Sequence, residues 1–160
     1  MPDGDAEWDS RGLEVHAMPS AERTIVIDRP PDQVFGFFAD PANDRAWRSH
    51  VKEIAALGPA GVGATVHQVI EGPGGRGLAA DLEITAYDPP TRYAFRVIAG
   101  PARPIGEFRF APSGTGTAVT FSLRADLGFL KGLVLSRPVQ SSMDGEMAAL
   151  DRAKALIEAR

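Results

Sequence analysis

"DRPPDQVFGFFADPANDRAW", residues 28–47, is the stretch of sequence that decides the fold. Two prolines, Pro30 and Pro31, follow its first two residues. Pro31 suits the first position of a helix because the N–H that it lacks would have no partner there. The helix is expected to end at Ala39, since the Asp-Pro pair that follows cannot continue it, and residues 41–46 can add one more short turn of helix. Four aromatic residues crowd into this stretch and either fill a core or cover a cavity: Phe35, Phe37, Phe38 and Trp47. Because such side chains are usually buried, we expect the three phenylalanines to belong to the core.

Runs of alternating apolar and polar residues on both sides of this stretch indicate β-strands. One strand, Glu22–Asp28, precedes the helix and is rich in β-branched residues. In a later segment Leu82 and Ile84 alternate with charged residues, which is the pattern of an antiparallel sheet with one buried and one wet face. Connectors rich in glycine and proline separate six such segments, namely Val51–Leu57, Ala64–Glu71, Leu78–Tyr87, Arg92–Ile98, Gly106–Ala111 and Thr117–Leu127.

The C-terminal segment, Pro138–Ala159, is expected to be the helix that covers the buried face of this sheet. Its apolar residues recur at helical spacing, and a helix of this length spans about 30 Å, enough to cross a curved sheet. The order of elements is one strand, two short helices, six strands and one long helix, which predicts an α+β fold in a single domain, residues 22–160. Residues 1–21 lack periodicity and are expected to form a flexible tail.

The composition argues against several classes of function. The net charge of −4 gives no electrostatic reason to expect binding to nucleic acid or to an anionic membrane surface, and the absence of cysteine excludes disulfides and thiolate catalysis. The N-terminal segment is unlike a signal peptide, and the longest apolar run, Leu127–Ser136, is too short to span a membrane. We therefore expect a cytoplasmic protein without membrane insertion. His16, His50 and His67 lack metal-ligand spacing, so no metal or other cofactor is expected.

Five pieces of the sequence, in this order, resemble a known family: "IDRPPDQVFGFFADPANDRAW", "GPAGVGATVHQV", "EITAYDPPTRYAFRV", "GTGTAVTF" and "ALDRAKALIEAR". They resemble the START and Bet v 1-like (SRPBCC) superfamily, and within it the bacterial polyketide cyclase/dehydrase group. The resemblance implies a helix-grip fold, in which a curved antiparallel sheet of about seven strands wraps around the long C-terminal helix and leaves an internal cavity. The family has no universal catalytic residue, so the resemblance assigns none to this chain.

The candidate ligand-binding residues are the side chains expected to face that cavity. Gln68 shares the parity of its apolar neighbours, so its amide faces inward and a ligand can supply the hydrogen bond it needs, whereas His67 is expected to face solvent. Trp47 is open to two interpretations, pocket wall and plain core, and the same holds for Met143 and Met147. The candidate set is Phe38, Trp47, Val66, Gln68, Leu82, Ile84, Phe95, Phe108, Phe121, Met143 and Met147.

Three hypotheses of function remain open. The first is binding of a hydrophobic small molecule, lipid-like or aromatic and polyketide-like, in the cavity. The second is a cyclase or dehydratase that uses the same cavity, for which the strongest acid or base candidates are His50, Tyr93, Arg103 and Glu107. The third is a regulatory domain that binds another protein, and a homodimer is also compatible with the sequence. An apolar cavity with neutral polar groups favours the first, a paired acid with a shifted pKa favours the second, and a filled interior favours the third.

Overall fold

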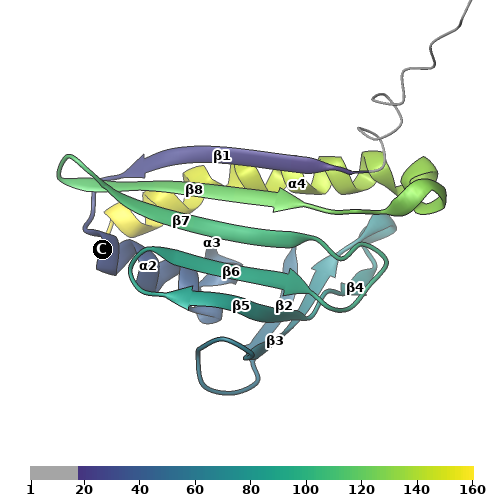
Figure 1. The fold of residues 1–160 in the computed structure, drawn as a ribbon, viewed down its shortest axis with the longest axis horizontal. Coiled ribbons are helices and arrows are strands. Elements are labelled where there is room, and N and C mark those ends of the chain that lie inside the picture. The colour runs from purple at the N-terminus through teal and green to yellow at the C-terminus, as the bar shows by residue number, and fades with distance from the viewer. Residues whose placement is uncertain (1–17) are drawn as a thin grey trace, which may run out of the picture.

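The computed structural model describes residues 18–160 (Figure 1). Residues 1–17 of the expected flexible tail lie outside the described residues. The last two residues of that tail, Ser20 and Ala21, belong to the first strand. The interpretation of residues 22–160 as one domain stays a prediction.

In chain order the elements are β1 (Ser20–Ile27), α2 (Pro31–Ala39), a 3₁₀ turn (Pro41–Asn43), α3 (Asp44–Trp47), β2 (Val51–Ala56), β3 (Thr65–Glu71), a second 3₁₀ turn (Pro73–Gly75), β4 (Gly77–Ala79), β5 (Leu82–Asp88), β6 (Arg92–Val97), β7 (Ile105–Ser113), β8 (Gly116–Arg124) and α4 (Gly128–Glu158).

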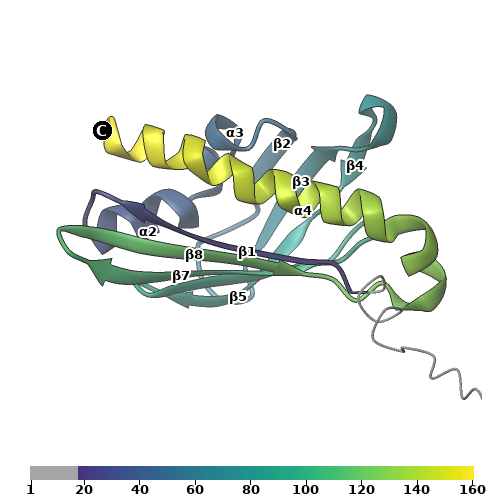
Figure 2. The same ribbon diagram turned by 90° about the horizontal axis from the view of Figure 1, so that it is seen from above.

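The strands form one antiparallel sheet in the order β1-β8-β7-β6-β5-β3-β2, with the short β4 paired to β3 as an eighth strand. The register shifts between Val51 and Glu53 and again between Ile84 and Ala86. Bulges of this kind bend a strand and increase its twist, so the sheet curls instead of lying flat. Figure 2 shows α4 lying along the hollow side of the curled sheet. The predicted helix-grip fold of the α+β class is confirmed.

The prediction of a single strand at Leu78–Tyr87 is wrong, because the chain divides there into β4 and β5. At the break the backbone N–H of Ala80 donates to the carbonyl of Gln68, and the carboxylate of Asp81 accepts from the backbone N–H of Gln68. The side chain of Asp81 therefore takes the place of a backbone carbonyl between β4 and β5, both of which pair antiparallel with β3. Sequence alternation alone does not reveal this replacement.

Helix α4 begins at Gly128, well before the predicted start at Pro138. The prediction was wrong because proline is typical of the first turn of a helix, whereas Pro138 lies inside this one, where its missing N–H removes one hydrogen bond. Side chains of α4 also hold β1. Gln140 exchanges two hydrogen bonds with the backbone of Ser20, and Nζ of Lys154 donates to the carbonyl of Val26 at 2.6 Å.

The phenylalanines of α2 lie in the core. Helix α2 packs against β6, β7 and β8, and Phe35, Phe37 and Phe38 are all buried. The ring of Phe35 meets those of Tyr87 and Phe110 edge-on, each with the centroids 5.4 Å apart. Edge-to-face contacts at this distance are favourable for aromatic pairs. The prediction that these three side chains belong to the core is confirmed.

Candidate functional site

An apolar cavity lies between the curled sheet and α4. Its volume is about 130 Å³, and its walls come mainly from β5 to β8 and from α4. The lining includes Ser142, which is exposed on α4, together with Ala102 and Pro104 from the loop that joins β6 to β7. The cavity therefore reaches the surface between α4 and this loop.

Six of the candidate ligand-binding residues line this cavity: Trp47, Leu82, Phe95, Phe108, Phe121 and Met143. Trp47 and Met143 are each only 3% exposed, so they serve both as core and as cavity wall. Phe38 is one layer removed, with its ring stacked on that of Phe108 at a centroid distance of 4.9 Å.

The other four candidates lie elsewhere. Val66 and Ile84 border a second, smaller hollow of about 40 Å³ beneath the β2–β3 loop. Met147 is buried in the core. Gln68 faces inward and is buried, as predicted, but both ends of its amide have partners inside the protein: Oε1 accepts from Arg48 at 2.7 Å and Nε2 donates to the carbonyl of Ala80 at 3.2 Å. For all eleven residues the contact with a ligand stays a prediction.

Charged residues that were not predicted form one end of the cavity. The guanidinium of Arg48 donates two hydrogen bonds to the carboxylate of Glu146, one of 2.8 Å from Nε and one of 2.6 Å from Nη2. Its Nη1 donates to the carboxylate of Asp44 at 3.0 Å. All three residues line the cavity, and the side chains of Asp44, Arg48 and Glu146 are only 15%, 12% and 9% exposed. Through Arg48 this cluster joins α3, β3 and α4.

Two further polar atoms are buried beside the cluster. Nε2 of His50 lies 2.6 Å from Oε1 of Glu146, which is an ion-pair distance when the imidazole is protonated, although the angle is poor for a hydrogen bond. The indole Nε1 of Trp47 is buried and makes no hydrogen bond of good geometry among the described residues, although it lies near enough to Asp44 to lower the pKa of that carboxyl. A buried donor normally has a partner, and an oxygen atom of a ligand can supply one.

The two carboxylates of the cluster have pKa values shifted in opposite directions. Burial raises the pKa of Asp44 to about 6, against the lowering effect of the charge and hydrogen bond of Arg48. For Glu146 burial also acts to raise the pKa, but the charge of Arg48 and the contacts with His50 and Arg48 outweigh it, so its pKa falls to about 2. Near pH 6 the cavity thus has one ionised carboxylate and one that still carries a proton about half of the time. A pair of acids with separated pKa values is typical of sites of proton transfer.

Of the four acid or base candidates from the sequence, His50 touches this cluster. Tyr93 is buried beside the smaller hollow, where burial raises the pKa of its phenol. Glu107 is on the outer face of the sheet and Arg103 is exposed in the β6–β7 loop. His67, which was expected to face solvent, is partly exposed, with its Nδ1 2.9 Å from Asp81.

The sequence contained two signals for the cluster that was missed. Asp44 and Arg48 stand four residues apart, the spacing at which opposite charges meet on a helix. Glu146 occupies a position three residues after Met143 and four before Leu150, so a charge falls on the apolar side of α4. A charge at such a position is rarely buried without a partner.

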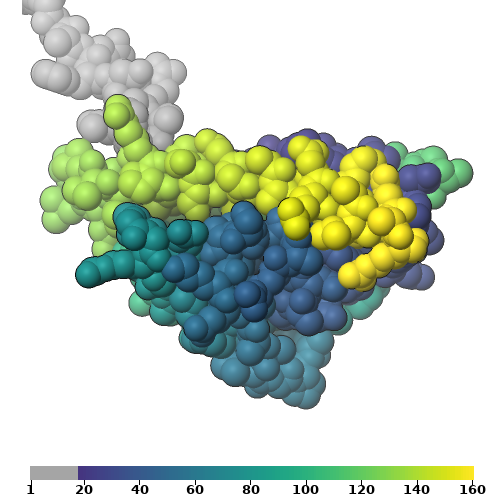
Figure 3. All heavy atoms as spheres, turned by 180° about the vertical axis from the view of Figure 1, so that it is seen from behind, coloured from purple at the N-terminus to yellow at the C-terminus, as the bar shows by residue number. Residues whose placement is uncertain are grey.

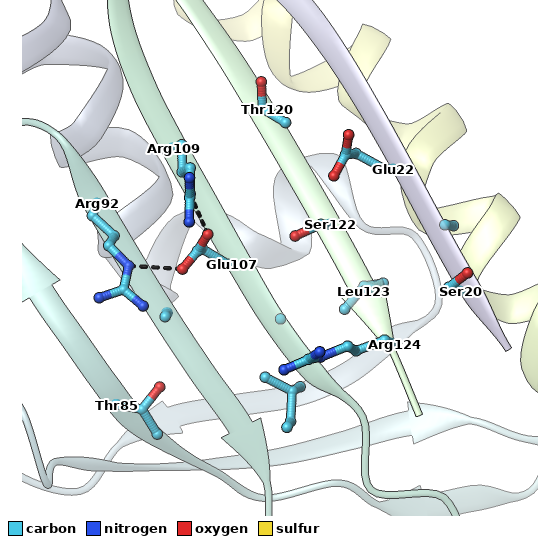
Figure 4. A pocket seen from close by; sticks show the side chains of 14 residues that line it. Ser20, Glu22, Thr85, Arg92, Glu107, Arg109, Thr120, Ser122, Leu123 and Arg124 are labelled. Carbon is cyan, nitrogen blue, oxygen red and sulfur yellow. Dashed lines mark hydrogen bonds and ion pairs between the residues drawn. The ribbon is translucent and has the colours of Figure 1, made fainter. Parts of the chain in front are cut away.

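Outside this cavity, the residues described by the structure offer no comparable site. A larger hollow of about 990 Å³ lies on the outer face of the sheet (Figure 4), but it is open, and three of its charged residues bind one another. There Nε of Arg92 donates to Glu107 at 2.7 Å, and Arg109 contacts the other oxygen of the same carboxylate. Within residues 18–160 no group of three His, Asp or Glu side chains is arranged to hold a metal ion.

The chain belongs to the family described as polyketide cyclase / dehydrase and lipid transport, which it matches over residues 18–155. This family is part of the superfamily that the sequence resembled. Two uncharacterized proteins, from Mycobacterium bovis and Mycobacterium tuberculosis, are each 29% identical to it over 85 residues, or 53% of this chain and 50% of each relative. The match thus spans about half the length of these curated relatives.

Solved structures share the fold at low sequence identity. The crystal structure of Ara h 8.0201 is 12% identical, with a TM-score of 0.70 over 89% of this chain and 99% of that one. The di-domain ARO/CYC StfQ from the steffimycin biosynthetic pathway is 15% identical, with a TM-score of 0.75 over 94% of this chain and 54% of that one. These structural similarities establish the fold. Because the sequence identities are this low, the function has to be argued from the site.

The shifted pKa of Asp44 predicts a dependence of stability on pH. Its pKa is about 6 in the folded protein, above the ordinary value of 3.8 that the side chain has when solvated in an unfolded chain. The folded state therefore holds the proton more strongly and loses stability as the pH rises from about 4 to 6. Asp44→Asn removes the charge and is expected to raise the free energy of unfolding at pH 8 by up to about 3 kcal/mol, the equivalent of a two-unit shift. At pH 4 the variant should match the unmodified protein.

Urea unfolding at pH 4, 6 and 8 measures this effect. Asp151→Asn is the matched control, because Asp151 is exposed and the hydrogen bond from Arg23 lowers its pKa, so no gain is expected at pH 8. A loss of stability at pH 8 in Asp44→Asn would show that Asp44 is held there chiefly as the charged partner of Arg48.

Proposed function

We propose that this protein binds a small, neutral, largely apolar molecule in the cavity, with a hydroxyl or similar group of the ligand directed at Asp44, Arg48 and Glu146. The observation that carries the proposal is a cavity with apolar walls and one buried, charged end. In such sites the apolar walls provide most of the affinity and a few polar groups fix the orientation of the ligand.

The charges at that end favour a neutral ligand over an anionic one. Arg48 is already bound by the carboxylates of Glu146 and Asp44, so a free fatty acid would bring a third carboxylate into a cluster with no uncompensated positive charge. Like charges in a buried site disfavour each other strongly. A hydroxyl can donate to a carboxylate oxygen and can accept from Nε1 of Trp47, which has no well-aligned acceptor among the described residues. Phenols, enols and alcohols therefore fit better than fatty acids.

The volume of the cavity limits the size of the enclosed part of the ligand. At about 130 Å³ it is close to the cavity of about 150 Å³ that holds one benzene molecule, and well below the roughly 300–1,000 Å³ of sites for drug-sized ligands. One ring fits inside. The remainder of a larger molecule would extend past Ser142 and Pro104, where the cavity reaches the surface.

The indole resonance of Trp47 provides a direct test. The chain has two tryptophans, so a Trp8→Phe variant identifies the Nε1–H signal of Trp47 in a ¹⁵N-labelled sample. Titration with p-cresol is expected to shift this signal to saturation, because the phenol oxygen comes within reach of the indole. Toluene should bind more weakly, since it has no hydroxyl, and benzoate should not bind.

Two neighbouring positions on α4 give matched variants. Ser142 lines the cavity and Ser141 does not, although both are exposed. Ser142→Phe should close the rim and abolish the shift, whereas Ser141→Phe should preserve it. The proposal fails if p-cresol leaves the Trp47 signal unmoved, or if both variants bind equally well.

A cyclase or dehydratase is a second candidate function, and the raised pKa of Asp44 is the observation that favours it. A buried carboxyl that keeps its proton near pH 6 can donate it to an oxygen atom of a bound substrate, while the ion pair with Glu146 keeps Arg48 beside it. Simple binding needs no such acid. To separate catalysis from binding, a poly-β-ketone is added to the protein and mass spectrometry follows its loss of water. Catalysis predicts that the Asp44→Asn variant loses this turnover.

A cytoplasmic location, a homodimer and a regulatory partner stay predictions.

A further inference from the structure

The first turns of α4, residues 128–137, carry large apolar side chains on the surface. Phe129, Leu130, Leu133 and Val134 are 64%, 79%, 67% and 74% exposed, and we refer to these four as the α4 stripe. Their spacing places them side by side on successive turns of the helix. Figure 3 shows this end of α4, in green, at the margin of the molecule. In the second half of the same helix the large apolar side chains are mostly buried, so the exposure is a property of the first turns.

Two cationic side chains share the first turns of α4 with the stripe, and one carboxylate, that of Asp126, accepts from the N–H of Gly128 at the start of the helix. Lys131 and Arg137 lie within the same turns, and no acidic residue occurs between Gly128 and Met143. The chain as a whole has a net charge of −4, so the local excess of positive charge runs against the rest of the molecule. Apolar side chains next to lysine and arginine on one helix are typical of segments that lie in the interface of an anionic bilayer.

The same helix joins the α4 stripe to the cavity. Pro138 separates the two parts, because the N–H that it lacks leaves the carbonyl of Val134 without its helical partner. Val139 and Ser142, which follow directly, line the cavity. Missing hydrogen bonds at proline are a common cause of bends in helices, so the first turns can adjust to a surface while the cavity wall stays in place. A surface bound by the stripe would lie close to the rim of the cavity.

We propose that the α4 stripe docks this protein on an anionic lipid surface. None of the helices in the described part of the chain is long and apolar enough to cross a membrane, so the contact is peripheral: the apolar side chains enter the headgroup region while Lys131 and Arg137 reach the phosphates. A second copy of the chain is a poorer occupant, because a two-fold contact would bring these cations towards their own counterparts. The inference does not depend on which molecule the cavity binds.

Cosedimentation with lipid vesicles tests the proposal. Vesicles of phosphatidylcholine with phosphatidylglycerol are compared with vesicles of phosphatidylcholine alone. The full chain is expected to bind the anionic vesicles and to be released as salt is raised. Leu130→Asp combined with Leu133→Asp is expected to weaken partitioning at least about tenfold, since two leucines lose their burial in lipid. Lys131→Glu combined with Arg137→Glu should remove the preference for anionic vesicles.

Val62→Asp is the matched control, because Val62 is 70% exposed on the β2–β3 loop, away from α4; it should bind as the unmodified protein does. All the substituted side chains are exposed, so circular dichroism and melting temperatures are expected to show folded variants. Absence of binding, or equal binding by the leucine variant, overturns the proposal. A dimer in light scattering that the leucine variant abolishes, without any binding to vesicles, overturns it too and assigns the stripe to a second copy.

Discussion

Arg48→Met is expected to lower the free energy of unfolding by about 3–5 kcal/mol, the usual effect of removing one partner from a buried ion pair. The substitution keeps most of the side-chain volume but leaves the buried carboxylate of Glu146 without its two hydrogen bonds and Gln68 Oε1 without its donor. It also removes the side chain that links Asp44 of α3 and Gln68 of β3 to Glu146 of α4, and leaves the hydrogen bond from Arg152 to Ala46 to join the two helices. Equilibrium unfolding in urea at pH 7 measures the loss.

The double variant Arg48→Met with Glu146→Leu separates charge from packing. Because it removes both members of the pair, it is expected to recover most of the stability lost in the single variant. Arg96→Met is the exposed control: the pair with Glu83 has side-chain exposures of 56% and 30%, and the loss should stay below about 1 kcal/mol. If Arg48→Met costs no more than this control, the cluster contributes little to the fold and its retention must be explained by function alone.

Phe108→Ala is expected to cost about 3–5 kcal/mol, as aromatic deletions in a core do. The ring of Phe108 is 4% exposed and lies parallel to that of Phe121 with the centroids 4.0 Å apart. It also forms part of the cavity wall, so its removal enlarges the cavity. The variant should therefore accept 2-naphthol, which has two rings, more readily than the unmodified protein does.

Calorimetry with p-cresol and 2-naphthol, together with urea unfolding, measures both effects. Phe129→Ala is the control for stability, since Phe129 is 64% exposed and its loss should change the free energy of unfolding by no more than about 0.5 kcal/mol. An unchanged preference between the two phenols would show that the cavity near Phe108 is not where the ring binds, even if the loss of stability is as large as expected.

Most of the fold could be predicted from local patterns. The proline pair at the start of α2 and the alternation in β5 to β8 each reflect a rule that acts within a few residues. The errors arose where a longer-range contact overrides the local pattern. Asp81 ends β4 by bonding to a strand thirteen residues earlier in the chain, and Pro138 is tolerated inside α4, where the local rule predicts a helix start.

The site was less predictable for the same reason. The apolar lining followed from alternation, since Phe95, Phe108 and Phe121 each stand on the buried side of their strands. The charged end of the cavity could not be predicted in this way, because its members are far apart in the sequence. Arg48 and Glu146 are separated by 98 residues. The alternation along its strand correctly predicted that Gln68 faces inward. Only the three-dimensional arrangement shows that its Oε1 accepts a hydrogen bond from Arg48 and not from a ligand.

The bonds from Gln140 and Lys154 to β1 also affect how the molecule can open. In the described sheet β1 pairs with β8 on one side alone, and a strand with unpaired backbone groups invites a further chain to add to it, which is a route to fibrils. Side chains of α4 occupy three of those groups, the N–H and the carbonyl of Ser20 and the carbonyl of Val26. Lifting α4 to widen the cavity would release them and expose a template for polymerisation. Opening at the β6–β7 loop carries no such hazard, and we expect ligands to pass there.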